Sequence, residues 1–119
     1  MDDRLARELV PDELWRIVQP LIPPQRARPQ GGGTREVEPR AVFTAVVYVL
    51  TTGCAWRHLP PSFGVSRATA HRRFTAWTKA GLWRRLHRAV LDELGSEGQL
   101  DWSRAIVDAA SVRAKRGAS

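Results

Sequence analysis

The sequence predicts a mainly α-helical fold, formed by one small domain. Three stretches that lack internal Gly and Pro carry apolar residues at helical spacing, and they cover residues 40–52, 66–79 and 82–94. A glycine closely follows each stretch, as is common at helix ends: Gly53, Gly81 and Gly95. The 119 residues are enough for one compact domain with short appendages.

The first organised segment covers residues 5–22 and should contain a short helix. Pro11-Asp12-Glu13 is typical of a helix start, because proline fits the first turn and acids favour the positive end of the helix dipole. An apolar stripe follows, and prolines from Pro20 onward end the helix; the stripe consists of Leu14, Ile17, Val18 and Leu21. We expect this helix to pack on the rest of the domain.

Residues 23–39 hold several prolines, the triplet Gly31-Gly32-Gly33 and three arginines, so no regular element is expected there. Two interpretations remain for this segment. It is either a solvated linker, which is the favoured reading, or a basic arm that follows a DNA groove or backbone.

The stretch 40–52 is the most apolar of the chain and is predicted to be a buried helix. The connector that follows, residues 54–64, is compact and contains two adjacent prolines. Its three large apolar side chains should enter the core around a single helical turn: Trp56, Leu59 and Phe63.

The stretch 66–79 has the pattern of a capped, amphipathic and basic helix. Ser66 is a good N-cap residue, because its hydroxyl can accept a hydrogen bond from a free amide of the first turn. Helical spacing puts Ala70, Phe74 and Trp77 on one side of the helix. The opposite side carries Thr69, Arg72, Thr75, Ala76 and Lys79. Such a helix is either an ordinary solvated surface or one that fits the DNA major groove.

The distribution of charge favours an anionic partner. The chain has 19 Lys and Arg against 12 Asp and Glu, a net charge of +7, and no acid lies between Pro39 and Leu91. A single-sign stretch of this length repels itself unless an anionic partner is present. Nucleic acid is preferred to a membrane surface, because the aromatic residues lie where a core is expected.

The C-terminal stretch, residues 101–119, has a different pattern. Ile106-Val107-Asp108 is predicted to be a strand that carries a carboxylate at its end. A carboxylate on a rigid element is a common ligand of divalent metals, although one that merely caps a turn would look the same.

Several strings of the sequence together resemble the N-terminal region of IS5-type insertion-sequence transposases. They are Pro11-Asp12-Glu13-Leu14-Trp15, Leu21-Ile22-Pro23-Pro24, Tyr48-Val49-Leu50, residues 52–60, His71-Arg72-Arg73-Phe74 with Trp77, and Gly81-Leu82-Trp83. Residues 107–117 resemble the point at which the catalytic domain of these enzymes begins.

This resemblance implies a transposase of the DDE class, whose catalytic core is ribonuclease-H-like. Three carboxylates of such a core hold two Mg²⁺ ions that serve strand cleavage and joining. Asp108 matches the first carboxylate, so it is the implied catalytic residue and metal ligand, and residues 106–108 would be the first strand of that core. The other two acids would lie beyond Ser119. Mg²⁺ is therefore expected only for the complete transposase, with no cofactor for this chain alone, which is expected to be inactive.

The resulting hypothesis divides the chain into four parts. These are an N-terminal helix (residues 1–22), a linker (23–39), a helix-turn-helix-like DNA-binding domain (40–95) and the start of a truncated catalytic domain (96–119). The expected DNA contacts are Arg67, Thr69, Arg72, Arg73, Thr75 and Lys79, with Arg72 and Lys79 reading guanine edges and Arg67 and Arg73 binding phosphates.

The expected partner is double-stranded DNA at the ends of the insertion element, and the expected location is the bacterial cytoplasm, at the nucleoid. Some members of the resembled family are split over two reading frames, so a second-frame catalytic polypeptide, a fused product or a second copy of the chain are further partners. Two alternatives remain. The chain could regulate transposition by occupying the ends, or act alone as a metal-dependent nuclease, which the small number of acids near Asp108 disfavours.

Overall fold

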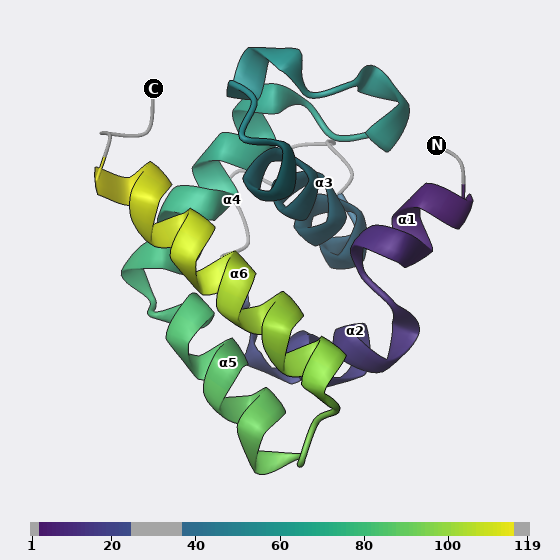
Figure 1. Cartoon of the computed structure of the whole chain (residues 1–119). Helices are drawn as coiled ribbons and strands as arrows, with labels where there is room; N and C mark the ends of the chain where they lie inside the picture. The colour runs from purple at the N-terminus through teal and green to yellow at the C-terminus, as the bar shows by residue number, and fades with distance from the viewer. Residues whose placement is uncertain (1–2, 25–36, 116–119) are drawn as a thin grey trace.

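The computed structural model describes residues 3–24 and 37–115, and in this part of the chain every regular element is an α-helix or a 3-10 turn. The mainly α-helical fold predicted from the sequence is therefore confirmed. The elements are α1 (Asp3–Leu9), α2 (Asp12–Val18), η1 (Gln19–Leu21), α3 (Pro39–Thr52), η2 (Trp56–His58), η3 (Pro61–Phe63), α4 (Arg67–Lys79), α5 (Leu82–Asp92) and α6 (Glu97–Lys115). Figure 1 shows α6 lying along α5, with α3 near the centre of the molecule.

Helix α3 is the central element, because it is apolar on nearly all sides and is buried accordingly. The buried hydroxyl of Thr44 donates to the carbonyl oxygen of Arg40 at 2.7 Å, so burial leaves this polar group satisfied. Gly53 ends α3 with φ of 72°, a left-handed conformation that favours glycine. The prediction of a buried helix over residues 40–52 is confirmed.

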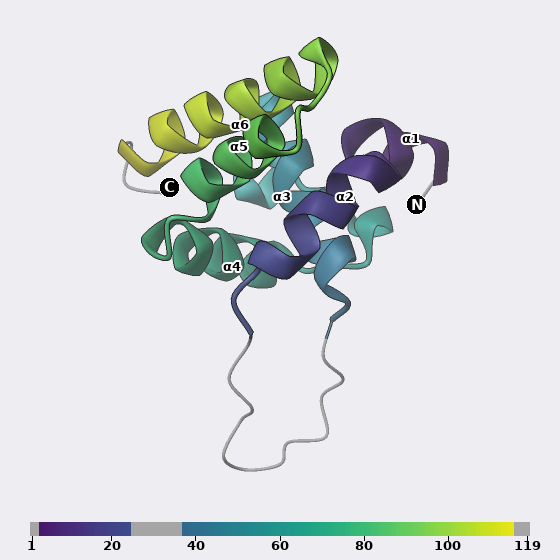
Figure 2. The same cartoon turned by 90° about the horizontal axis from the view of Figure 1, so that it is seen from below.

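A cluster of aromatic rings joins the helices, and Phe43 of α3 lies at its centre. Phe43 is fully buried, and its ring centroid lies 5.8 Å from that of Trp15, 5.9 Å from Trp77 and 6.2 Å from Trp83. These partners come from α2, α4 and α5, so the single ring packs three other helices onto α3. Figure 2 shows α4 on one side of the molecule and α6 on the opposite side, with α3 and α5 between them.

The N-terminal segment contains the short helix that the sequence predicts, now α2, and a further short helix, α1, before it. Pro11 separates the two, because proline lacks an amide hydrogen and disfavours helical geometry at the residue before it. The apolar side chains Leu14, Ile17 and Val18 are buried as expected.

Helix α6 packs on the same core as the other helices. It buries Ser103, Ile106 and Ala110. Hydrogen bonds also tie it to distant parts of the chain: Trp102 Nε1 donates to the carbonyl oxygen of Leu9 at 3.0 Å, and Ser103 Oγ lies 2.7 Å from His87 Nδ1. The division of the chain at residue 95 stays a prediction, and α6 shares its core with α3 and α5 on the far side of that boundary.

The prediction of a strand at Ile106-Val107-Asp108 is wrong, because these residues lie inside α6. Buried positions recur at helical spacing, since 103, 106 and 110 face the core together. No Gly or Pro interrupts residues 99–115, and alanines, the best helix formers, occupy positions 105, 109, 110 and 114. The first strand of a ribonuclease-H-like core is therefore not present in the described residues.

The connection between α3 and α4 covers residues 53–66 and contains two 3-10 turns, where one helical turn was expected. The side chains of Trp56, Leu59 and Phe63 are buried, as predicted. A helix-turn-helix motif usually has a turn of about three or four residues. The connection here is longer, and the helix-turn-helix-like character of this unit stays a prediction.

Candidate nucleic-acid interface

Helix α4 is held in place by its cap and by one apolar face. Ser66 Oγ accepts a hydrogen bond from the amide of Thr69 at 3.1 Å, which confirms the predicted N-cap and contributes about 1 kcal/mol. Ala70, Phe74 and Trp77 are buried, as their spacing predicts. The orientation of α4 is therefore fixed, and its other side faces solvent.

The solvent side of α4 carries cations separated by small residues. Arg67, Arg72 and Lys79 are exposed, and so are Ala68 and Ala76. None of the three cations makes an ion pair within residues 3–24 and 37–115. Arg72 makes one weak contact, with its guanidinium 3.4 Å from Thr69 Oγ1. These three side chains can therefore bind an anion without breaking an existing ion pair.

The two threonines predicted as contacts lie at the margins of this face, and both are half-buried. The hydroxyl of Thr75 donates to the carbonyl oxygen of His71 at 3.1 Å, and Thr69 Oγ1 accepts from Ser66 Oγ at 2.9 Å. Each hydroxyl thus retains spare hydrogen-bonding capacity, Thr75 as an acceptor and Thr69 as a donor.

Arg73 is half-buried on the flank of α4. It lines a hollow together with Trp15, Pro24 and Val37, so it lies beside the two described residues that border segment 25–36. The predicted contact residues are thus divided: Arg72 and Lys79 lie on the open face, Arg67 is exposed in the first turn at one flank, and Arg73 is half-buried at the other flank. The three arginines of the basic arm considered above lie outside the described residues.

The cationic character extends to α5 and the connector. Arg84, Arg85 and Arg88 point outward from α5, as predicted, and Arg57 is exposed on η2. These four side chains form no ion pair with the described part of the chain.

Arg40 also lies in the acid-free stretch but, unlike the arginines of α5 and η2, it forms an ion pair with another described residue. Its partner is Asp12, and its guanidinium also donates to the carbonyl oxygen of Val10. The hydrogen bond and the positive charge of Arg40 lower the pKa of Asp12 below its ordinary value. Arg40 therefore serves to join α3 to the start of α2.

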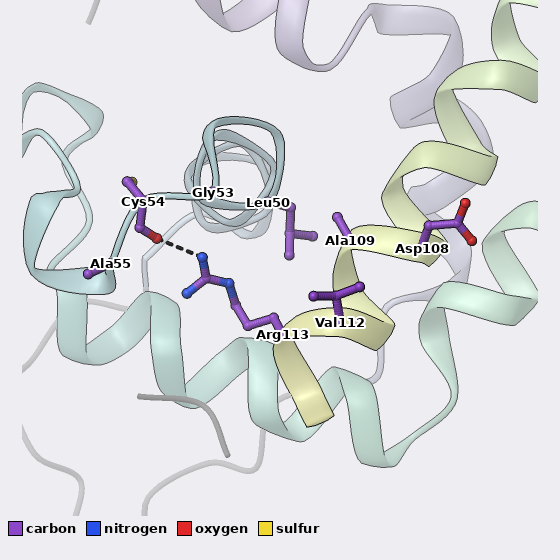
Figure 3. A pocket seen from close by; sticks show the side chains of 8 residues that line it. All are labelled: Leu50, Gly53, Cys54, Ala55, Asp108, Ala109, Val112 and Arg113. Carbon is purple, nitrogen blue, oxygen red and sulfur yellow. Dashed lines mark hydrogen bonds between the residues drawn. The ribbon is translucent and has the colours of Figure 1, made fainter. Parts of the chain in front are cut away.

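A stack of side chains packs against α4 at His71. The sequence did not predict this stack. The Trp56 ring stacks on His71 of α4 at 5.1 Å, and the Arg113 guanidinium lies 5.3 Å from the centroid of the Trp56 ring. Arg113 also donates to the carbonyl oxygen of Cys54 at 2.7 Å (Figure 3). Helix α6 is thereby linked to the connector that positions α4. No local pattern indicates this contact, because its partners are 59 residues apart.

Asp108, the predicted catalytic acid, lies on the exposed side of α6. It borders a hollow between α6 and the end of α3, and Figure 3 shows its carboxylate directed away from Arg113. Within the described ranges, no three His, Cys, Asp or Glu side chains are close enough to hold a metal ion. The described residues therefore contain no cluster of three such ligands, and the role of Asp108 in a complete enzyme stays a prediction.

Comparison with known proteins identifies the family. A family model described as "Putative transposase of IS4/5 family (DUF4096)" matches residues 10–87 of this chain, from the start of α2 into α5. The chain belongs to the IS4/5 transposase family. It is also 42% identical over 112 residues to the "Insertion element IS402 uncharacterized 16.2 kDa protein" of Burkholderia cepacia, an alignment that covers 92% of this chain and 76% of that relative. No solved structure matches the chain significantly.

The match to the IS4/5 transposase family confirms the resemblance found in the sequence. The matched residues include the whole of α4, whereas α6 lies beyond them. None of the helices in the described ranges is long and apolar enough to cross a membrane. The relative comes from a bacterial insertion element; the cytoplasmic location of this chain stays a prediction.

Proposed function

We propose that this chain is the DNA-binding part of an IS4/5-family transposase, and that α4 recognises the terminal inverted repeats of the insertion element. The observation that carries this proposal is the solvent face of α4. On that face Arg72 and Lys79 are exposed and make no ion pair with the residues that the structure describes, and small residues beside them leave room for close approach.

The dimensions and chemistry of α4 suit the DNA major groove. The groove is about 12 Å wide and admits one α-helix, and an arginine there can donate two hydrogen bonds to the O6 and N7 atoms of guanine. Arg72 is the first candidate for such a contact, because it lies at the middle of the exposed face, and Lys79 is the second. Arg67, in the first turn, and Arg73, at the flank, suit the phosphates on either side of the groove.

Thr69 and Thr75 would add weaker contacts with DNA than the arginines. Thr69 and Thr75 already make local hydrogen bonds, so a contact with DNA would use their remaining donor or acceptor capacity or their methyl groups. The acid-free stretch supplies the sequence-independent attraction to the backbone, which makes the affinity fall steeply with salt concentration.

The binding of two DNA duplexes tests this proposal. Wild-type chain is titrated by fluorescence anisotropy with a short duplex that carries an end of its element, and with a duplex of the same bases in shuffled order. The chain should prefer the end by a factor of roughly 10³ or more, as sequence-specific binders do, and both affinities should fall with rising salt. Equal affinity for the two duplexes would refute the assignment to element ends.

A further inference from the structure

A second cationic site lies at the end of α4, where α4, α5 and α6 meet. A hollow of about 350 Å³ opens there, and it is lined by Thr78, Gly81, Trp83, Arg84, Ser111 and Lys115, among others. Figure 2 shows the C-terminal end of α4, the start of α5 and the C-terminal end of α6 at the same end of the molecule. The site therefore joins residues 78–84, at the junction of α4 and α5, with residues 107–115 of α6.

The residues around this hollow are suited to an anion. Arg84 and Lys115 border it from two different helices, both are exposed, and neither makes an ion pair among the described residues. Ser111 adds an exposed hydroxyl, and none of the described residues that line the hollow is acidic. Asp108 borders the different hollow on the α3 side of α6, and it makes no ion pair with Arg84 or Lys115.

The floor of the hollow is rigid. Trp83 is buried, its Nε1 donates to Thr78 Oγ1 at 3.0 Å, and its ring packs against Phe43 and Phe74. This hydrogen bond spans the turn between α4 and α5, so it fixes the backbone at Arg84 relative to the solvent face of α4. A cation held on a fixed base loses less freedom on binding than one on a mobile loop.

We propose that this hollow binds a phosphate group of the DNA backbone next to the groove that α4 occupies. This inference rests on the proposed function. Helix α4 has 13 residues and is about 20 Å long, whereas the major groove is about 12 Å wide. One end of a docked α4 therefore comes close to a sugar–phosphate strand. Lys79 lies in the last turn of α4, and the hollow continues the cationic surface beyond it.

The chemistry of the two cations matches a phosphodiester. The planar guanidinium of Arg84 can donate two parallel hydrogen bonds to phosphate oxygens, and the ammonium of Lys115 supplies a compact positive charge. Contacts with phosphate carry no sequence information, so this site adds affinity and fixes the position of α4 on the duplex.

The test compares two double variants of equal charge. Arg84→Gln with Lys115→Gln removes the cations of the hollow. Arg85→Gln with Arg88→Gln removes two exposed cations of α5 that do not line it. Both are titrated with the element-end duplex and the shuffled duplex over a range of salt concentrations. The chains are first compared by circular dichroism, so that only folded variants enter the comparison.

The Arg84→Gln and Lys115→Gln double variant, the hollow variant, should lose affinity for both duplexes by about fivefold for each cation, as expected for exposed ionic contacts. The slope of log K against log salt should become shallower by about 0.9 for each lost phosphate contact, and the preference for the element end should stay unchanged. The control variant should lose clearly less. Equal losses in the two variants, or an unchanged salt slope in the hollow variant, would overturn the proposal.

The position of the contact can be tested independently on the DNA. Single phosphates are replaced one at a time by neutral methylphosphonates. Wild type should lose affinity at a flanking phosphate where the hollow variant loses none, and identical profiles for the two proteins would overturn the site. The comparison of the two double variants, unlike the methylphosphonate profile, needs no fixed position of the protein on the DNA, so it holds on the shuffled duplex as well. A wild type without preference for the element end would therefore refute the proposed function and leave the phosphate site standing.

Discussion

Phe43→Ala is expected to lower the free energy of unfolding by about 3–5 kcal/mol, the usual loss for removing a fully buried aromatic ring. Phe43 has no exposed surface and contacts the rings of Trp15, Trp77 and Trp83. Truncation to alanine would leave a cavity at the point where α2, α4 and α5 meet α3. Because a domain is typically stable by only about 5–15 kcal/mol, this is a large share of the total.

Urea unfolding followed by far-ultraviolet circular dichroism measures this effect. Phe43→Leu keeps part of the ring volume and should lose markedly less, so it stays measurable if the alanine variant is mostly unfolded. Leu91→Ala is the control, because Leu91 is 48% exposed and its truncation should change stability by only about 0.5 kcal/mol. A loss below about 1 kcal/mol for Phe43→Ala would show that the ring does not hold the helices together.

Arg72→Ala is expected to weaken binding to the element-end duplex by about 1–3 kcal/mol, or roughly 5- to 150-fold. Arg72 lies at the middle of the exposed face of α4, and its single contact within the described residues is the 3.4 Å approach to Thr69. Its removal therefore costs the protein little stability. Binding to the shuffled duplex should fall much less, because base readout is lost and most phosphate contacts remain.

Fluorescence anisotropy on both duplexes separates the loss of base readout from the loss of a phosphate contact. Arg16→Ala provides the matched control, since Arg16 is also an exposed arginine and the substitution removes the same charge from a different helix, α2. The preference for the element end should fall in Arg72→Ala and persist in Arg16→Ala. An equal loss on both duplexes in Arg72→Ala would assign Arg72 to the backbone and contradict its role in base readout.

Local rules account for most of the helical fold. The N-cap at Ser66 and the buried side of α4 follow from spacing and from the chemistry of one hydroxyl, so both could be predicted from the sequence. The contacts of Phe43 could not, because periodicity identifies a buried face but not the distant rings that cover it. Tertiary packing decides which helices meet.

Helix α6 shows how a local pattern misleads. Ile106 and Val107 favour a strand by their branched side chains, and the resemblance to a catalytic domain pointed the same way. The helical period is hidden because small or polar residues, Ser103 and Ala110, occupy two of its buried positions. Their burial depends on α5 and α3, which a local reading of residues 101–119 cannot include.

In the candidate site, too, some features follow from local spacing and others depend on tertiary packing. The outward direction of Arg72 and Lys79 follows from a period of 3.6 residues, and exposure agrees with it. The position of Arg84 and Lys115 around one hollow, and the support of α4 by Arg113 through Trp56, involve residues that are far apart in the sequence. No sequence spacing predicts such pairs.

The exposed face of α4 is the surface proposed to contact DNA. Nuclear magnetic resonance measures this directly, by recording the amide and arginine side-chain signals of the labelled chain during titration with the element-end duplex. The largest shifts are expected on residues 67–79, with the side chain of Arg72 among them, and the shifts should extend to Arg84. Largest shifts on α1 and α2, with the signals of α4 unchanged, would contradict this proposal.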